Sequence, residues 1–140
     1  IRDGYTHIKR TWQSGDKVEL SLKMQIELMQ ANPQVRADAG KVAIMRGPLV
    51  YCLEQEDNGE NLSAITLSVK DVLAQEVDNA LCNGAVVIRA KGERCDESTW
   101  CNALYRPYKT QQHSIDIKAV PYFLWGNRQK GEMQVWIRKG

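Results

Sequence analysis

The sequence predicts an all-β domain, an antiparallel and jelly-roll-like β-sandwich with few or no helices. Apolar and polar residues alternate with period two along most of the chain, which is typical of strands with one buried face. Turn residues separate these segments, and we expect about eight to ten short strands. No segment shows the sustained 3.6-residue period of an amphipathic helix. These observations favour a sandwich, with a barrel as the second choice.

The clearest alternation lies near the N-terminus. Val18, Leu20 and Leu22 begin a row of apolar residues that continues to Leu28 and alternates with polar residues. At about 3.3 Å per residue this strand is long, so a bend or bulge is expected near Lys23. Further strands are predicted over residues 6–12, 41–45, 49–54, 65–69, 85–90, 114–125 and 133–137.

Three segments modify this pattern. Gly47-Pro48 separates two predicted strands, because proline has no N–H for a central ladder. The β-branched run at residues 85–90 is predicted to be buried on both faces. Residues 71–81 fit neither period and are predicted to be irregular, and the polar residues 91–100 are predicted to form a surface loop.

Length and composition indicate an ordinary globular domain. The chain has 140 residues, 43% hydrophobic and 26% charged, so one domain over residues 1–140 is expected. Nineteen basic and seventeen acidic residues are interspersed, which argues against a nucleic-acid surface. The longest nearly apolar stretch, residues 119–125, is shorter than the about 20 residues of a membrane span. The chain starts at Ile1 without a leader, and we expect an excised part of a larger protein.

The four cysteines are predicted to be free thiols. A domain of this length folds without disulfides, and Cys52 lies in an apolar run where a reduced cysteine packs as a small hydrophobe. The cysteines lack the paired spacing and nearby histidines of a zinc site, so no metal site is expected. No role is predicted for Cys82, Cys95 and Cys101, and a cytoplasmic location is expected.

Two groups of polar residues resemble catalytic sets, but their spacing does not support catalysis. Glycoside hydrolysis needs two carboxyl groups roughly 5–10 Å apart, one protonated and one ionised. Glu54, Glu56 and Asp57 cluster in the sequence, but a solvated loop accounts for them. The His-Ser-Asp group within residues 113–116 lies on one predicted strand, where neighbours point to opposite faces. No catalytic or cofactor-binding residue is predicted.

An aromatic segment near the C-terminus contains the candidate binding residues. Sugar-binding surfaces combine aromatic rings with polar side chains, and such residues occur together at a predicted strand end. The candidate carbohydrate contacts are Tyr122, Trp125, Asn127 and Arg128. The alternative is packing: in a strand that starts at Pro121 or lies at a sheet edge, Phe123 and Trp125 share one face, and two large rings there are expected to form core.

Residues 42–54, with the sequence V-A-I-M-R-G-P-L-V-Y-C-L-E, resemble a segment of bacterial β-L-arabinofuranosidases of glycoside hydrolase family 127. Residues 4–20 look like the segment that follows the catalytic barrel in this family, and residues 33–38 like the turn before R-G-P-L-V-Y. Residues 119–136 are similar to its C-terminal signature, A-x-P-Y-x-x-W-x-N-R followed by G-x-M-x-V-W. The blocks keep the family order, and residues 71–118 match least.

The resemblance implies that the chemistry lies elsewhere in a longer chain. In this family an upstream (α/α)6 barrel holds a cysteine nucleophile and a zinc site with further cysteines and a glutamate. Cys52, in the β-rich C-terminal part, is therefore not taken as the nucleophile. We expect a non-catalytic domain without its own cofactor, whose partner is that barrel or a second subunit of an enzyme acting on carbohydrate. The alternative is a carbohydrate-binding module that holds arabinose-containing glycans through Tyr122 and Trp125.

Overall fold

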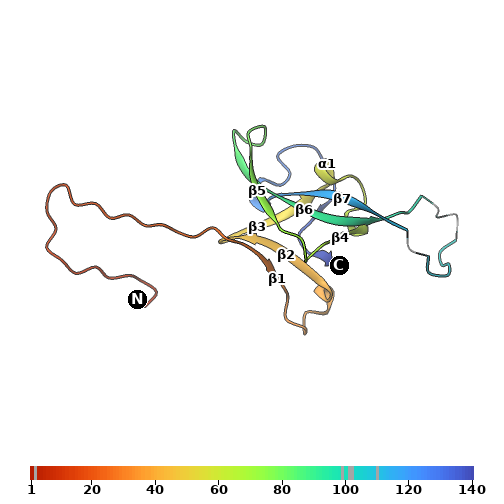
Figure 1. Ribbon diagram of the computed structural model, residues 1–140, viewed down its shortest axis with the longest axis horizontal. Coiled ribbons are helices and arrows are strands. Elements are labelled where there is room, and N and C mark those ends of the chain that lie inside the picture. The colour runs from red at the N-terminus through yellow and green to blue at the C-terminus, as the bar shows by residue number, and fades with distance from the viewer. Residues whose placement is uncertain (2, 99, 101–102, 110) are drawn as a thin grey trace.

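The computed structural model describes residues 1, 3–98, 100, 103–109 and 111–140, and β-strands dominate it (Figure 1). The strands are β1 (Ile26–Met29), β2 (Lys41–Arg46), β3 (Leu49–Glu54), β4 (Ile65–Leu67), β5 (Ala74–Asp78), β6 (Ala85–Cys95), β7 (Gln112–Pro121), β8 (Met133–Gln134) and β9 (Ile137–Lys139). Helical turns are α1 (Gln55–Asn58), η1 (Arg36–Asp38), η2 (Leu62–Ala64) and η3 (Tyr122–Leu124). The all-β class with little helix is therefore confirmed. In the described part of the chain, no helix has the length and apolar character needed to cross a membrane.

The strands form one sheet that closes on itself. Their pairing order is β1-β2-β9-β4-β6-β7-β3-β8, and β5 is attached to β6. A further pairing joins β2 to β3, so the six strands from β2 to β3 make a closed circuit. Closure of this kind is the property of a barrel, which was the second choice from the sequence. The pairs are antiparallel except for β4 with β9, so the sheet is mixed, and the jelly-roll arrangement stays a prediction.

The hydrophobic core has two parts, one on each face of the central strands. All six strands of the circuit contribute to the larger cluster, which contains Val42, Ile44, Tyr51, Leu53, Leu62, Ile65, Leu67, Ile88, Ala90, Ile117, Ala119 and Ile137. The smaller cluster contains Cys52, Leu81, Val87 and Val120. Val87 and Ile88 are neighbours on β6 that enter different clusters. The prediction that residues 85–90 are buried on both faces is therefore confirmed at Val87 and Ile88, whereas Arg89 is exposed.

The strands on either side of Gly47-Pro48 also agree with the sequence, whereas three later segments do not. Residues 74–78 form β5 instead of irregular structure, and all five pair with β6. β6 continues to Cys95 through the predicted surface loop. The single strand predicted over residues 133–137 is two short ones, β8 beside β3 and β9 between β2 and β4.

Gly92 shows why β6 continues past its β-branched part. A Cβ atom at this position would lie 2.5 Å from both the Cδ1 of Ile117 and the carbonyl oxygen of Thr66. The glycine therefore lets β4 and β7 approach β6 closely from its two sides. The segment was predicted to be a loop because its residues are polar, and the sequence does not show the two strands that pair with it.

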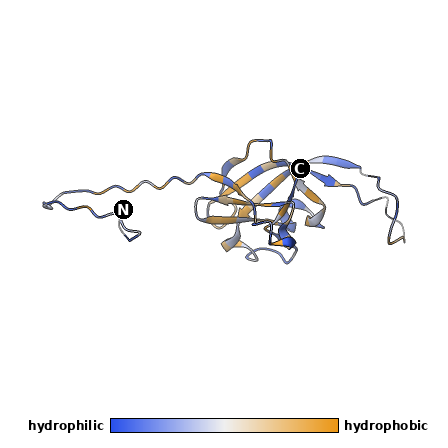
Figure 2. Ribbon diagram, turned by 90° about the horizontal axis from the view of Figure 1, so that it is seen from below, coloured by the Kyte–Doolittle hydropathy of each residue, from blue (hydrophilic) through white to orange (hydrophobic). Residues whose placement is uncertain are grey.

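The N-terminal segment departs most from the prediction. Residues 6–12 form no strand, and only residues 26–28 of the predicted strand over 18–28 belong to a paired strand, β1, which continues to Met29. Ile26 lies opposite Arg46, the last residue of β2, and the chain then turns at Gly47, so residues before 25 have no partner strand in the described chain. Figure 1 shows this segment extending away from the sheet, and Figure 2 shows apolar residues along it.

Candidate functional site

The four residues predicted to contact carbohydrate follow β7 directly, and the structure divides them into two pairs. Tyr122 and Trp125 lie at the two ends of η3, with ring centroids 6.1 Å apart and ring planes 22° from parallel. They are 44% and 45% exposed. Asn127 and Arg128 belong to the following loop, where the Nδ2 of Asn127 donates a hydrogen bond to the carbonyl oxygen of Leu124 at 3.0 Å.

The prediction that Phe123 and Trp125 form core is wrong. β7 ends at Pro121 instead of beginning there, and the chain turns directly into η3. A 3-10 turn has three residues per turn, so Tyr122 and Trp125 come to the same side, whereas a strand would alternate them. Phe123 is 63% exposed, and Leu124 is the residue of η3 that packs against the smaller core cluster. We call Tyr122, Phe123 and Trp125 the aromatic patch.

A hollow of about 250 Å³ lies beside the aromatic patch and includes Phe123 in its wall. The wall is mostly apolar and contains Leu49, Ala85 and Pro121. Arg46 also lines this hollow, and its Nε donates a hydrogen bond to the Oε1 of Gln75 at 2.8 Å. The surface next to the patch therefore combines apolar area with one cation.

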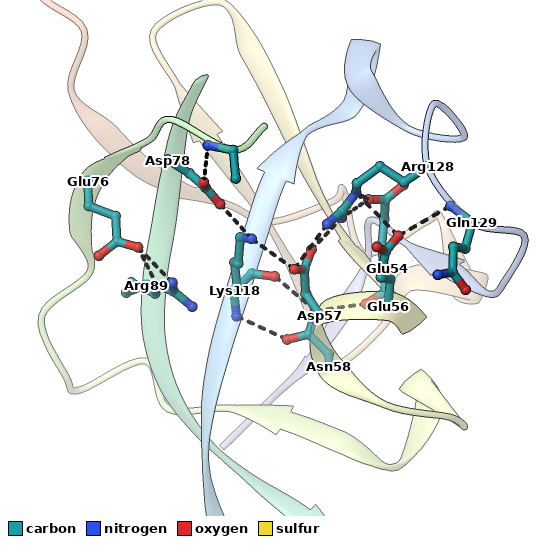
Figure 3. Close-up of polar contacts among 11 residues, drawn as sticks. Glu54, Glu56, Asp57, Asn58, Glu76, Asp78, Arg89, Lys118, Arg128 and Gln129 are labelled. Atoms are coloured by element: carbon teal, nitrogen blue, oxygen red, sulfur yellow. Dashed lines mark hydrogen bonds and ion pairs between the residues drawn. The ribbon is translucent and has the colours of Figure 1, made fainter. Parts of the chain in front are cut away.

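Arg128 faces the protein and forms ion pairs with three carboxylates, those of Glu54, Asp57 and, at 3.5 Å, Glu56 (Figure 3). Its Nε donates to the Oε2 of Glu54 at 3.1 Å, and its Nη1 donates to the Oδ1 of Asp57 at 3.1 Å. Its Nη2 contacts the carboxylates of both Glu54 and Asp57. The backbone N–H of Gly126 donates to the remaining Glu54 oxygen at 3.1 Å, so Glu54 ties down the loop that follows the patch. Arg128 thus forms ion pairs within the protein, and its contact with carbohydrate stays a prediction.

Lys118 extends this cluster from β7. Its Nζ lies 2.8 Å from an oxygen of Asp57 and 2.8 Å from an oxygen of Asp78, near the end of β5. Asn58 exchanges two hydrogen bonds with the backbone of Lys118, at 2.9 and 3.0 Å. We call Glu54, Asp57, Asp78, Lys118 and Arg128 the ion cluster. Sequence analysis missed Lys118, although a lysine between the buried residues of a central strand indicates a buried partner.

The ion cluster corrects the prediction that Glu54 and Asp57 belong to a solvated loop. Glu54 is only 6% exposed, and α1 places Asp57 between the two cations. Burial opposes ionisation of Asp57, but hydrogen bonds from Arg128 and Lys118 outweigh it and hold the pKa of Asp57 below its usual value. A carboxyl group held ionised in this way cannot act as the protonated acid that glycoside hydrolysis requires.

The pKa values of three further members, Arg128, Lys118 and Asp78, change in the direction that favours their charged forms. Hydrogen bonds to Asp57 and Glu54 raise the pKa of Arg128, although partial burial opposes the change. Burial disfavours the charged form of Lys118, but its contacts with Asp57 and Asp78 raise its pKa overall. A hydrogen bond from Lys118 lowers the pKa of Asp78. All four groups are therefore held in their charged forms, as a structural network requires.

The described residues do not fit the zinc site that the family resemblance implies for the longer enzyme. In these residues no three His, Cys, Asp or Glu side chains come together as metal ligands would. Burial, with a smaller contribution from the nearby Glu54 carboxylate, raises the pKa of Cys52 to about 12. This disfavours the thiolate, which is the form that binds metal and acts as a nucleophile. Cys101 lies outside the described residues.

Cys52 is expected to react last with a thiol reagent. It is fully buried in β3, whereas Cys82 is exposed in a turn and Cys95 is partly exposed at the end of β6. Titration of the native protein with an aromatic disulfide reagent, followed by mass spectrometry of the labelled peptides, gives the order of labelling. Modification of Cys52 at the rate of Cys82 would contradict the burial of β3.

A comparison with protein families decides the identity of the fold. Residues 26–138 match the family model described as the glycoside hydrolase family 127 C-terminal domain. The chain belongs to glycoside hydrolase family 127. The match begins at the first residue of β1 and ends within β9, so it covers the whole closed sheet.

Individual relatives agree with this assignment. A non-reducing end β-L-arabinofuranosidase from Bifidobacterium longum subsp. longum is 33% identical over 99% of this chain, which spans 22% of that relative. A solved family 127 β-L-arabinofuranosidase from Geobacillus stearothermophilus T6 has a TM-score of 0.79 and 46% identity, covering 84% of this chain and 18% of its own. Another solved structure, described as a glycoside hydrolase, has a TM-score of 0.82 and 37% identity over 95% of this chain and 22% of its own. The chain thus spans about a fifth of its relatives.

Proposed function

We propose that this family 127 C-terminal domain is a non-catalytic accessory domain. In a longer β-L-arabinofuranosidase-like protein it packs against the catalytic part through the aromatic patch. The observation that carries the proposal is the exposure of Tyr122, Phe123 and Trp125 on one short turn beside an apolar hollow. Aromatic residues and arginine are enriched in protein interfaces, and exposed clusters of this kind mark interaction sites on soluble domains.

The rigid support of the patch favours a docking role. Pro121 precedes η3 at the end of a central strand, and Leu124 anchors η3 on the core. After the patch, Glu54 accepts a hydrogen bond from Gly126 and pairs with Arg128. Surfaces that are already ordered lose little conformational entropy on binding, so little of the free energy gained by burying the aromatic rings is offset.

The ion cluster agrees with an accessory role as well. Its carboxylates are committed to Arg128 and Lys118 and hold structure together, as described above. The catalytic chemistry, with the zinc that the family resemblance implies, is accordingly assigned to another part of the longer protein, and carbohydrate is bound there. The three described cysteines are free thiols, and this supports a cytoplasmic location.

Replacing Trp125 with alanine tests the docking role. In the 140-residue chain the domain should lose less than about 1.5 kcal/mol of stability, because Trp125 is only half buried there. In the full-length protein the same change should shorten the half-life of thermal inactivation several-fold, because it removes an interface anchor. The matched control is Tyr108→Ala, which removes an aromatic residue that is 91% exposed outside the patch. Equal half-lives for the two variants would contradict docking through the patch.

The near-parallel rings of Tyr122 and Trp125 favour a second candidate function, binding of arabinose-containing glycans. Two exposed rings whose planes differ by 22° can stack against a sugar face. Under this alternative, Trp125→Ala abolishes retention of the domain on an arabinan or arabinogalactan matrix and leaves inactivation of the full-length protein unchanged. Retention that is absent in the unmodified domain would exclude this alternative. If the aromatic patch contacts a second subunit instead, the protein should form an oligomer that Trp125→Ala dissociates.

A further inference from the structure

The segment before β1 has the alternating sequence of a strand, but it forms no strand and has no partner in the described chain. Val18, Leu20 and Leu22 are 62%, 78% and 72% exposed. With period two they continue the row of Ile26 and Leu28, which pack against the larger core cluster. Polar residues occupy the opposite face. One side of the segment is therefore apolar over its whole length and is exposed to solvent.

The register of β1 explains why this segment cannot join the domain's own sheet through β2. Ile26 already lies opposite the last residue of β2, and the N–H of Gly47 donates to the carbonyl oxygen of Gln25 at 2.9 Å. Met24 then lies over the turn, with its sulfur 2.6 Å from the position of a Cβ on Gly47. From this point the chain leaves the sheet, as Figure 1 shows.

The comparison with relatives indicates where a partner is found. The C-terminal domain model begins at residue 26, whereas the B. longum relative aligns over 99% of the chain, including nearly all of residues 1–25. The segment therefore has a counterpart in that longer protein, although it precedes the part of this chain that the C-terminal domain model matches. We propose that residues 17–25 form a β-strand in a sheet of the preceding part of the same polypeptide, with Val18, Leu20 and Leu22 on that sheet's core face.

This arrangement gives the two units a continuous connection. Residues 17–25 run directly into β1, so a strand fixed in the preceding sheet also fixes the start of β1. Gln25 at this junction accepts a hydrogen bond from Gly47, in the turn between β2 and β3. An attachment in the same chain also has a high effective concentration, which favours it over a second copy. The proposal concerns a different surface from the aromatic patch and stands whether or not the patch docks.

Hydrogen exchange in the full-length protein and in the 140-residue chain tests the proposal. Backbone amides of residues 17–25 should exchange at least about 100-fold more slowly in the full-length protein, because a paired strand protects them. In the 140-residue chain the same amides should exchange at nearly the unprotected rate. Equal rates in the two proteins, whether protected or not, would overturn the proposal.

A pair of substitutions on opposite faces separates pairing from simple ordering. In the full-length protein, Leu20→Asp should abolish the protection of residues 17–25, whereas Ser21→Asp should leave it within about 3-fold of the unmodified value. Where Leu20→Asp prevents folding, Leu20→Ala should still reduce protection about 10-fold. Equal effects of Leu20→Asp and Ser21→Asp would overturn the assignment of the faces.

A second copy of the chain is the other possible partner. A dimer of the 140-residue chain that Leu20→Asp dissociates would overturn the proposal in favour of that second copy. Trp125 is unchanged in these variants. A result that overturns the strand proposal therefore leaves the proposed docking function of the aromatic patch unaffected.

Discussion

Replacing Arg128 with methionine is expected to lower the free energy of unfolding by about 3 kcal/mol, because it leaves two buried carboxylates short of their cation. Glu54 and Asp57 side chains are only 7% and 10% exposed, and Arg128 contacts both. The value lies at the lower end of the usual range because Gly126 still donates to Glu54 and Lys118 still binds Asp57. The loop after the aromatic patch should also lose the contacts that Arg128 makes with Glu54 and Asp57, one part of its attachment.

Chemical denaturation of the 140-residue chain measures this effect, and Arg89→Met is the matched control. Arg89 pairs with Glu76 on the surface, where both side chains are close to half exposed. Exposed ion pairs contribute at most about 1 kcal/mol, so the control should be nearly neutral. Similar losses of unfolding free energy for Arg128→Met and Arg89→Met would show that burial does not make the ion pairs of Arg128 more stabilising than an exposed pair.

The dependence on pH gives this prediction a second signature. The folded pKa of Asp57 lies below its usual value, so the stability from its ionised form is present at neutral pH and is lost as pH falls through the folded pKa. Without Arg128 the folded pKa of Asp57 should rise, and protonation then relieves the unpaired charge. The difference in stability between the variant and the unmodified domain should therefore shrink below about pH 4. A difference that stays constant from pH 7 to pH 3 would be inconsistent with charge loss as its cause.

Period two in the sequence predicted strands well where both neighbours of a strand lie in the same domain. The runs around Gly47-Pro48 and at Val87-Ile88 were predicted correctly, because alternating or continuous apolar residues indicate whether one or both faces of a strand are buried. The same rule failed at residues 18–25, since alternation specifies a buried face but not the strand that covers it. β5 was missed for the opposite reason: most of it is exposed, and only its pairing with β6 defines it.

The candidate site was predicted in part. The sequence placed Tyr122 and Trp125 together, but a strand was assumed where the chain makes a 3-10 turn, and this reversed the expected burial of Phe123 and Trp125. The sequence could not indicate the ion pairs of Arg128, because its partners are 74 and 71 residues away in the sequence. Long-range ion pairs have no local pattern, so only the fold brings Arg128 to Glu54 and Asp57.

Replacing Leu53 with alanine should destabilise the domain by about 3–4 kcal/mol, within the range for a large apolar residue removed from a rigid core. Leu53 is fully buried in β3, where it lies opposite Ala119 of β7 on one side and Gln134 of β8 on the other. It belongs to the core cluster to which all six strands of the closed circuit contribute, so neighbouring side chains are fixed from several directions. The cavity therefore cannot collapse easily.

Val50→Ala is the control for Leu53→Ala, because it shortens a side chain on the same strand at a position that is 36% exposed. We expect a loss of less than about 1 kcal/mol for this change, since it creates no enclosed cavity. Urea denaturation followed by tryptophan fluorescence measures both variants. Equal losses of unfolding free energy in the two variants would mean that the core around Leu53 is not rigid, contrary to the pairing of β3 with a strand on each side. If β2 and β3 did not close the circuit, the interior could relax around the missing side chain, and Leu53→Ala would fall toward the value of the control.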